Sequence, residues 1–206
     1  MVDAHAANSK LAEVVRGLGL HEHLCVIYET QEEQFAAVLP YLRKGLERGE
    51  ECLYFADEST AVAVLDALRK IGTGVDQYLR SGALTITHKR ATDLQQGRFD
   101  PDSWIGFLDQ ATAEAEAAKF SALRLLVDMS WALRGNNSTR KFIEFESRVN
   151  HFVRDHDVGA IMPPTGVSWG PGNERISGAV VAVKVCPLPD EVSFRSKGAI
   201  AAGTES

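Results

Sequence analysis

Apolar residues recur along this chain with two alternating spacings, one typical of helices and the other of buried strands. Leu11, Val15 and Leu18 follow the spacing of an amphipathic helix, whereas 24–28 (Leu-Cys-Val-Ile-Tyr) is a short continuous apolar run. Such a run is typical of a strand that is buried on both faces. The same spacings predict helices over about 9–17, 30–49, 60–71, 101–119 and 138–155, and strands over about 24–28, 52–56, 83–88, 123–129, 158–162 and 179–186.

Two helix starts carry recognisable capping residues. Thr30-Gln-Glu-Glu33 forms a capping box, in which the threonine hydroxyl accepts a hydrogen bond from the backbone N–H of Glu33. Asp100-Pro101 places an N-cap carboxylate before a proline, whose missing N–H is not needed in the first turn. The polar, glycine-containing segment 89–100 before it is predicted to be a loop, and the alternating strand 83–88 is predicted to lie near an edge of the sheet.

The alternation of strand and helix predicts an α/β fold with three layers, in which a mainly parallel central sheet carries helices on both faces. We expect an N-terminal helix or extension at 1–19, one domain over 20–190, and a polar, frayed tail at 191–206. Ligands of such sheets bind beyond the carboxyl ends of the strands. The residues that directly follow each strand are therefore the first candidates for a functional site.

Composition and charge exclude several classes of protein. The 206 residues are 45% hydrophobic, which argues against a disordered or fibrous chain. The formal net charge is −6, and the densest basic stretches are isolated doublets, so we expect no direct binding to nucleic acid. These doublets are Arg43/Lys44, Lys89/Arg90 and Arg140/Lys141.

The sequence also predicts a cytoplasmic protein. No apolar run approaches the roughly 20 residues that a membrane span needs, and the first residues lack the pattern of a signal peptide. Cys25, Cys52 and Cys186 are odd in number and far apart, which argues against a framework of disulfides.

The first candidate site is His21-Glu-His23-Leu-Cys25. Alternate residues of a strand share a face, so His23 and Cys25 could meet one ligand, with His21 just ahead of them. Imidazole and thiolate suit zinc or a redox metal, which makes these three residues the metal candidates. A second pair of ligands at metal-site spacing is missing from the sequence. The alternative is a small buried cysteine beside a histidine that hydrogen-bonds locally.

The second candidate is Asp128, an acidic residue that directly follows the apolar run Leu125-Leu126-Val127 within the predicted strand 123–129. An acidic residue at this position resembles the Walker B aspartate that holds the hydration shell of Mg²⁺. The chain contains no Gly-x-x-x-x-Gly-Lys-[Ser/Thr] motif, so we expect neither nucleotide binding nor hydrolysis. Asp128 is then either a polar group that lines a pocket or a cap at the end of the strand.

The third candidate is the loop 163–172, which contains three prolines and three glycines. Its Trp169 could close over an apolar ligand or pack down to anchor the loop. Ser130 and Ser168 lie in no Gly-x-Ser-x-Gly elbow, so nucleophilic catalysis lacks support and we expect no enzyme.

Several motifs, taken in order, resemble the MEDS family, the methanogen/methylotroph DcmR sensory domain. They are His23-x-Cys25-x-x-Tyr28-Glu-Thr, Pro40-Tyr-Leu-x-x-Gly45-Leu-x-x-Gly-Glu50-x-Cys52, Phe99-Asp-Pro101, and Leu123-Arg124 leading to Asp128-Met-Ser-Trp131. The resemblance covers about residues 20–160. It implies a RecA/KaiC-like core without a phosphate loop. By this match His23 and Cys25 are the candidate sensing residues, while Asp128 and Trp131 are motif positions without an assigned role.

The leading hypothesis is a non-enzymatic sensory domain that binds a small organic molecule at the carboxyl ends of the strands. His23, Cys25, Asp128, Trp131 and Trp169 are its expected ligand-binding residues. Binding would be relayed through a homodimer or through a separate kinase or transcription regulator. Two alternatives stay open: a redox- or metal-responsive thiol protein that uses Cys25 with His21 or His23, and a ligand-free interaction module derived from an NTPase fold.

Overall fold

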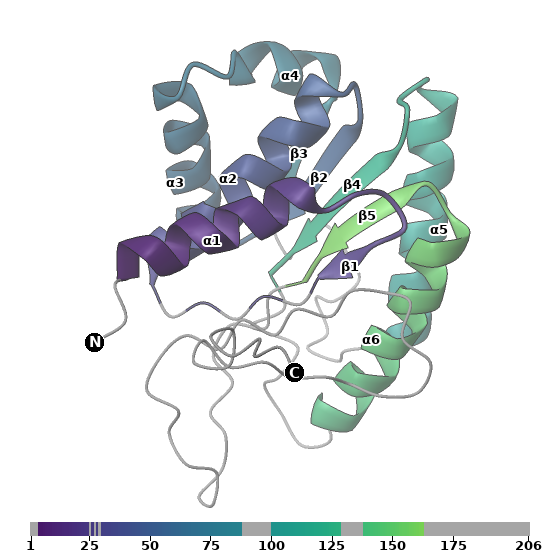
Figure 1. The fold of residues 1–206 in the computed structure, drawn as a ribbon. Helices are drawn as coiled ribbons and strands as arrows, with labels where there is room; N and C mark the ends of the chain where they lie inside the picture. Colours follow the sequence, from purple (N-terminus) through teal and green to yellow (C-terminus); the bar gives the residue numbers. More distant parts are fainter. Residues whose placement is uncertain are drawn as a thin grey trace, which may run out of the picture.

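The computed structural model of the chain describes residues 4–24, 26, 28, 30–87, 100–128 and 138–162. Within them a five-stranded sheet, all of whose pairings are parallel, has the strand order β1-β5-β4-β2-β3 (Figure 1). The strands are β1 (His23–Leu24), β2 (Glu51–Phe55), β3 (Leu84–Thr87), β4 (Leu123–Val127) and β5 (Val158–Ile161). The helices are α1 (Ala4–Gly17), α2 (Gln31–Glu47), α3 (Glu58–Lys70), α4 (Val75–Ser81), α5 (Pro101–Ala117) and α6 (Ser138–Asp155).

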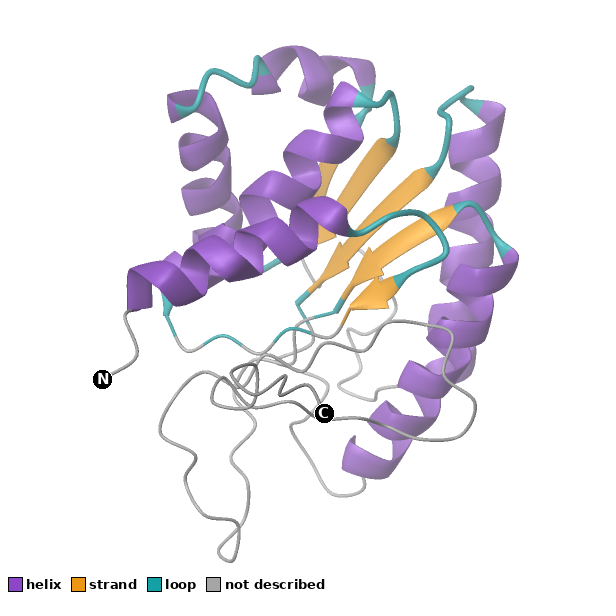
Figure 2. Cartoon of the chain, viewed as in Figure 1, coloured by secondary structure: helices purple, strands orange, loops and turns teal. Residues whose placement is uncertain are grey.

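The helices cover the sheet in two layers, as Figure 2 shows. Apolar residues of α1, α2, α3 and α4 form one buried cluster with alternate strand residues such as Tyr54 and Leu126. Residues of α5 and α6 form a second cluster with the intervening strand residues, such as Phe55 and Leu125. Strand side chains alternate between the two faces, so β2, β4 and β5 each contribute to both clusters. The three-layer α/β fold predicted from the sequence is confirmed.

The direction of the crossovers defines a place for a ligand. After β2 the chain passes through α3 and α4 and returns to the sheet at β3, on one side of β2. After β4 it passes through α6, on the opposite face, and returns at β5, away from β2. Adjacent β2 and β4 therefore form a topological switch point. In open α/β sheets the crevice beyond the carboxyl ends of such a pair is the usual binding site.

Side-chain caps explain where three of the helices begin. The Thr30 hydroxyl accepts a hydrogen bond from the Glu33 backbone N–H at 3.2 Å, which confirms the predicted hydrogen bond of the capping box at the start of α2. Asp100 caps α5 through the Ser103 N–H, directly before Pro101, as predicted. Asp57 accepts from the Thr60 N–H at 2.8 Å and starts α3.

The structure differs from the predicted elements in three places. The first strand was predicted over 24–28, but β1 comprises His23–Leu24, and 25, 27 and 29 lie outside the described residues. The short helix α4 was missed, because seven residues between Gly74 and Gly82 carry too few turns for a clear apolar periodicity. Helix α1 begins five residues earlier than predicted. The predicted strand 179–186 and most of the predicted loop 89–100 lie outside the described residues.

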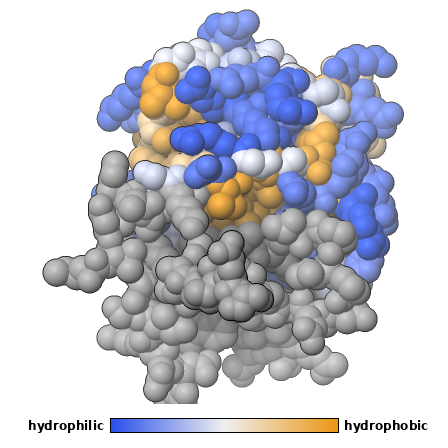
Figure 3. Space-filling model, in the orientation of Figure 1, coloured by the Kyte–Doolittle hydropathy of each residue, from blue (hydrophilic) through white to orange (hydrophobic). Residues whose placement is uncertain are grey.

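The surface of the described residues is mainly polar. On the face drawn in Figure 3, apolar residues form small separate patches within a largely hydrophilic surface. The large apolar side chains most exposed among the described residues are Val14, Val62 and Ile71. None of the helices that the structure describes is long and apolar enough to cross a membrane.

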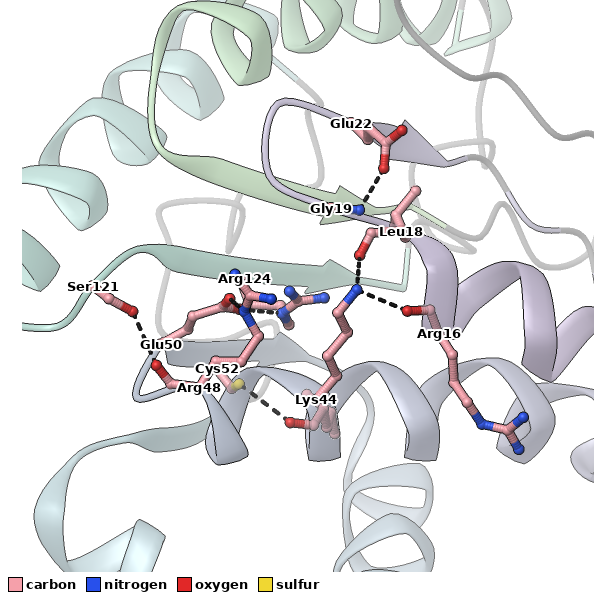
Figure 4. Close-up of polar contacts among 11 residues, drawn as sticks. Arg16, Leu18, Gly19, Glu22, Lys44, Arg48, Glu50, Cys52, Ser121 and Arg124 are labelled. Atoms are coloured by element: carbon pink, nitrogen blue, oxygen red, sulfur yellow. Dashed lines mark hydrogen bonds and ion pairs between the residues drawn. The ribbon is translucent and has the colours of Figure 1, made fainter.

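A buried ion pair joins β2 to β4 at the amino ends of the strands. Glu50 directly precedes β2, Arg124 is the second residue of β4, and both side chains are 1% exposed. The Arg124 Nε donates to one carboxylate oxygen of Glu50, while the half-exposed Arg48 donates to the other at 2.8 Å (Figure 4). The Arg124 guanidinium also stacks on the Tyr41 ring of α2, 4.4 Å from its centroid. The Arg124 guanidinium is thus held by both the Glu50 carboxylate and the face of the Tyr41 ring.

Gly45 lets α2 pack directly onto this ion pair. A Cβ atom at this position would lie 2.6 Å from the Arg124 Cδ and 2.6 Å from the Cys52 Sγ. Both neighbours are buried, so neither can swing into solvent. A glycine is therefore required here by the close approach of a helix and two strands.

We predict that Gly45→Ala lowers the free energy of unfolding by about 1–3 kcal/mol, because the added methyl group overpacks the space above Arg124 and Cys52. Gly106→Ala is the matched control, since a Cβ at this position in α5 meets no atom within 4 Å. The control should gain about 0.5–1 kcal/mol, because alanine favours the helix. Urea unfolding of both variants measures the two effects, and equal stability of the variants would contradict the packing account.

Candidate functional site

Polar side chains gather beyond the carboxyl ends of the strands, next to the switch point. Tyr54 comes from β2, Asp57 and Asp128 follow β2 and β4, Tyr28 follows β1, and Gln34 lies in the first turn of α2. Tyr28 and Tyr54 belong to or pack against the apolar cluster under α1–α4. We call these five residues the carboxyl-edge cluster.

Gln34 connects the two tyrosines of this cluster. Its side-chain Nε2 donates to the Tyr28 hydroxyl oxygen at 3.0 Å and lies 3.5 Å from the Tyr54 hydroxyl oxygen. The first contact is a normal hydrogen bond, and the second is at the long limit for one. Since Gln34 is itself buried, the amide fixes the two hydroxyl groups near one point.

The environment keeps both tyrosines in their neutral form. Burial raises the pKa of Tyr28 far above its usual range, and Tyr54, Asp128 and Asp57 raise it further, against a smaller opposing effect of the Gln34 hydrogen bond. Burial likewise raises the pKa of Tyr54, with additional contributions from Asp128 and Asp57. A neutral phenol is a hydrogen-bond donor as well as an acceptor, so each hydroxyl can bind a ligand atom.

The two carboxylates of the cluster differ in their surroundings. Asp57 is exposed, and its oxygens accept hydrogen bonds from the Thr60 N–H and from the hydroxyls of Ser59 and Thr60. Asp128 is only 4% exposed, and its backbone N–H donates to the Phe55 carbonyl oxygen at 2.9 Å. Asp57 therefore serves the start of α3, while Asp128 brings a buried carboxyl group to the carboxyl ends of β2 and β4.

His23, the predicted sensing residue on β1, lies on the other face of the sheet. It is fully buried, its Nδ1 is 2.8 Å from the Asn150 Oδ1 of α6, and its Nε2 is 3.7 Å from the Glu146 Oε2. His23 pairs with Ala160, which in turn pairs with Leu125. Asp128 is three residues beyond Leu125. The backbones of His23 and Asp128 are therefore about 10 Å apart along the strands and about 10 Å apart across them. The structure does not bring His23 and Asp128 together.

The other predicted site residues divide into exposed and undescribed positions. His21 is about half exposed, lies 3.3 Å from the Asp157 carboxylate, and adopts a left-handed backbone conformation (φ 63°). Cys25, Trp131 and Trp169 lie outside the described residues. Among the residues that the structure describes, no three His, Cys, Asp or Glu side chains are grouped closely enough to hold a metal ion.

Cys52, the cysteine that the structure describes, is an unreactive type of thiol. It is buried beside Arg124, and its Sγ is 3.6 Å from the Leu42 carbonyl oxygen. Burial raises the pKa of this thiol to about 12, although Arg124 opposes the shift. The nucleophilic thiolate is therefore scarcely populated near neutral pH.

Tyr28, Gln34 and Tyr54 were not among the site residues predicted from the sequence. In the sequence Tyr54 is part of an apolar strand, and Gln34 is an ordinary polar residue of a helix. The one available signal was position, because Tyr28 and Gln34 flank the connection from β1 to α2, where α/β sheets bind ligands.

The parallel sheet with helices on both faces is a RecA-type α/β fold. A KaiC-like protein from the hyperthermophilic archaeon Pyrococcus horikoshii shares this fold, with a TM-score of 0.52 and 15% identity over 86% of this chain and 84% of that one. The chain belongs to the MEDS family, the methanogen/methylotroph DcmR sensory domain, whose profile matches residues 22–163. It is also 26% identical, over 150 residues, to the transcriptional repressor DcmR of Methylorubrum extorquens.

The family match gives the chain a sensory role. The aligned part covers 71% of this chain and 52% of the repressor, so the chain spans about half the length of that relative. The suspected family resemblance is confirmed. The likeness to the archaeal protein concerns the fold alone.

We predict that His23 stabilises the attachment of α6 to β1. His23→Asn should lower the free energy of unfolding by about 2 kcal/mol, because the shorter side chain leaves a cavity and breaks the contact with Asn150. His21→Asn is the matched control and should change stability by less than about 0.5 kcal/mol, since its contact with Asp157 is exposed and asparagine tolerates a left-handed backbone. Chemical denaturation compares them, and an unchanged stability of His23→Asn would refute the structural role.

Proposed function

We propose that this chain is a non-enzymatic, cytoplasmic sensory domain that binds a small organic molecule at the carboxyl-edge cluster. The observation that carries the proposal is the convergence of Tyr28, Tyr54 and Asp128 beside the switch point of the sheet. Apolar rings, two neutral hydroxyls and one carboxyl group at the same place provide both an apolar surface and a few polar groups. That combination is typical of small-molecule sites.

A nucleotide is not the ligand that we propose. A phosphate-binding loop in this fold connects a strand to a helix through glycines and a lysine. The corresponding connection here, residues 25–30, reads Cys-Val-Ile-Tyr-Glu-Thr and contains neither residue type. The cluster in addition carries two carboxyl groups, which disfavour a polyphosphate.

The proposed relay runs through α2 and α3, because both helices begin at the cluster. Gln34 lies in the first turn of α2, and Asp57 caps α3. α2 packs against α1, and Lys44 of α2 donates hydrogen bonds to the carbonyl oxygens of Arg16 and Leu18 at 2.7 Å (Figure 4). A ligand that moves Gln34 would therefore shift α1 as well, and with it an interface to a second copy or to a separate kinase or transcription regulator. The similarity to a transcriptional repressor supports an output in transcription.

The alternative function is a thiol- or metal-responsive protein that uses His23 and Cys25. The contact of His23 with Asn150 and Glu146 supports a structural role for this histidine, which weakens that alternative. A thiol-labelling pH profile of Cys25, in a variant that carries Cys186→Ser, separates the two. A reactive thiol below pH 7 would favour the redox alternative, and an inert thiol would favour the binding domain.

We predict that Tyr54→Phe weakens small-molecule binding about 2- to 10-fold, because one hydrogen bond is lost while the ring remains. The measurement is the ligand-induced rise in melting temperature across short alcohols, ketones, amines and haloalkanes. Tyr78→Phe is the matched control, since Tyr78 is a half-buried tyrosine of α4, a helix that leads into the amino end of β3. It should respond like the unmodified protein. Equal responses of Tyr54→Phe and the unmodified protein, or no response from any compound, would reject this site.

A further inference from the structure

We infer that the carboxyl-edge cluster selects a neutral oxygen compound with a short alkyl body, a ketone or an alcohol, whose oxygen accepts hydrogen bonds from Tyr28 and Tyr54. This inference rests on the proposed function and specifies its ligand class. It is carried by two independent observations, namely the direction of the hydrogen bonds within the cluster and the sign of the charges around it.

The hydrogen bonds within the cluster leave the hydroxyl hydrogens of Tyr28 and Tyr54 available as donors. Gln34 donates its Nε2 hydrogens toward both tyrosine oxygens, so on each phenol the contact with the amide uses an oxygen lone pair. Neither hydroxyl hydrogen has an acceptor among the residues that the structure describes. Tyr54 is fully buried, and a buried donor without an acceptor is unfavourable. A carbonyl or alcohol oxygen has two lone pairs and can accept from both phenols at once.

The charges disfavour an anion as that acceptor. Asp128 and Asp57 both act on Tyr54 in the direction that disfavours negative charge, and both act on Tyr28 in the same way. A carboxylate or phosphate placed between the hydroxyls would meet the same repulsion at low dielectric. An uncharged acceptor therefore fits this place better than an anion. An alcohol has the further possibility of donating its own hydrogen to the Asp128 carboxylate.

The surroundings set the character of the rest of the ligand. Val26 and Ala56 are fully buried members of the apolar cluster to which Tyr54 belongs. Both lie beside the cluster in the chain, two residues from Tyr28 and Tyr54 respectively. An alkyl group next to the bound oxygen would meet the apolar surroundings of Tyr54, whereas a second polar group would lose its hydration there.

The test uses five probes that each have four non-hydrogen atoms. Acetone, 2-propanol, 2-chloropropane, isopropylammonium and acetate keep the size constant and vary only hydrogen bonding and charge. Their dissociation constants are measured with the full chain by ligand-observed NMR titration at one ionic strength. Acetone and 2-propanol should bind at least 3-fold more tightly than 2-chloropropane and isopropylammonium, and acetate should bind most weakly.

Four variants, one of them a control, locate the preference. Tyr28→Phe and Tyr54→Phe should each weaken acetone about 2- to 10-fold and leave 2-chloropropane unchanged. Tyr78→Phe should leave both constants unchanged. Asp128→Asn removes the negative charge at nearly constant shape, and should strengthen acetate at least 3-fold relative to acetone.

The outcomes separate this inference from the proposed function. The contrary outcome is that isopropylammonium or 2-chloropropane binds most tightly of the five probes and that this binding is lost in Tyr54→Leu. That result would overturn the proposed ligand class but would keep the proposed site. Acetate binding as tight as acetone would overturn the charge argument in the same way. Binding of none of the probes, together with no effect of any tyrosine variant on the wider panel of compounds, would overturn both proposals.

Discussion

The contact between Glu50 and Arg124 fixes the relation of β2 to β4, and the position of the candidate site depends on that relation. Two charged side chains that are 1% exposed must be well paired, because an isolated charge of this kind is strongly unfavourable in a protein interior. Arg48 satisfies the second carboxylate oxygen, and the ring of Tyr41 covers the guanidinium. Removing one partner of such a pair typically costs about 3–5 kcal/mol. The register between the two central strands is thus tied to a specific polar contact.

That contact lies at the amino ends of the strands, and the candidate site lies at the opposite ends of the same strands. β2 and β4 are in register from Glu51 with Leu123 to Phe55 with Val127. The register that the ion pair supports at one end therefore places Tyr54 and Asp128 beside each other at the other end. The buried ion pair and the candidate site therefore lie at opposite edges of the sheet. Residues of the binding edge can accordingly be varied without disturbing the buried ion pair.

The sequence was sufficient for the fold class because its strong signals are local. Continuous apolar runs, the Thr30 and Asp100 caps and the helical spacing of Phe145, Val149 and Phe152 all depend on neighbours in the chain. The site was less predictable. His23 and Asp128 were expected to frame one ligand, but strand order and side-chain alternation place them on different faces. Gln34 and Tyr54 come together only through the packing of α2 against the sheet. No spacing along the chain predicts that contact.

The most direct test of the central claim is to locate bound 2-propanol on the folded chain by backbone amide chemical-shift mapping. The account predicts the largest shift changes at Tyr28, Gln34, Tyr54 and Asp128, and none at Glu50 or Arg124. Shift changes centred instead on His23, Glu146 and Asn150 would place the ligand on the opposite face of the sheet and contradict the account.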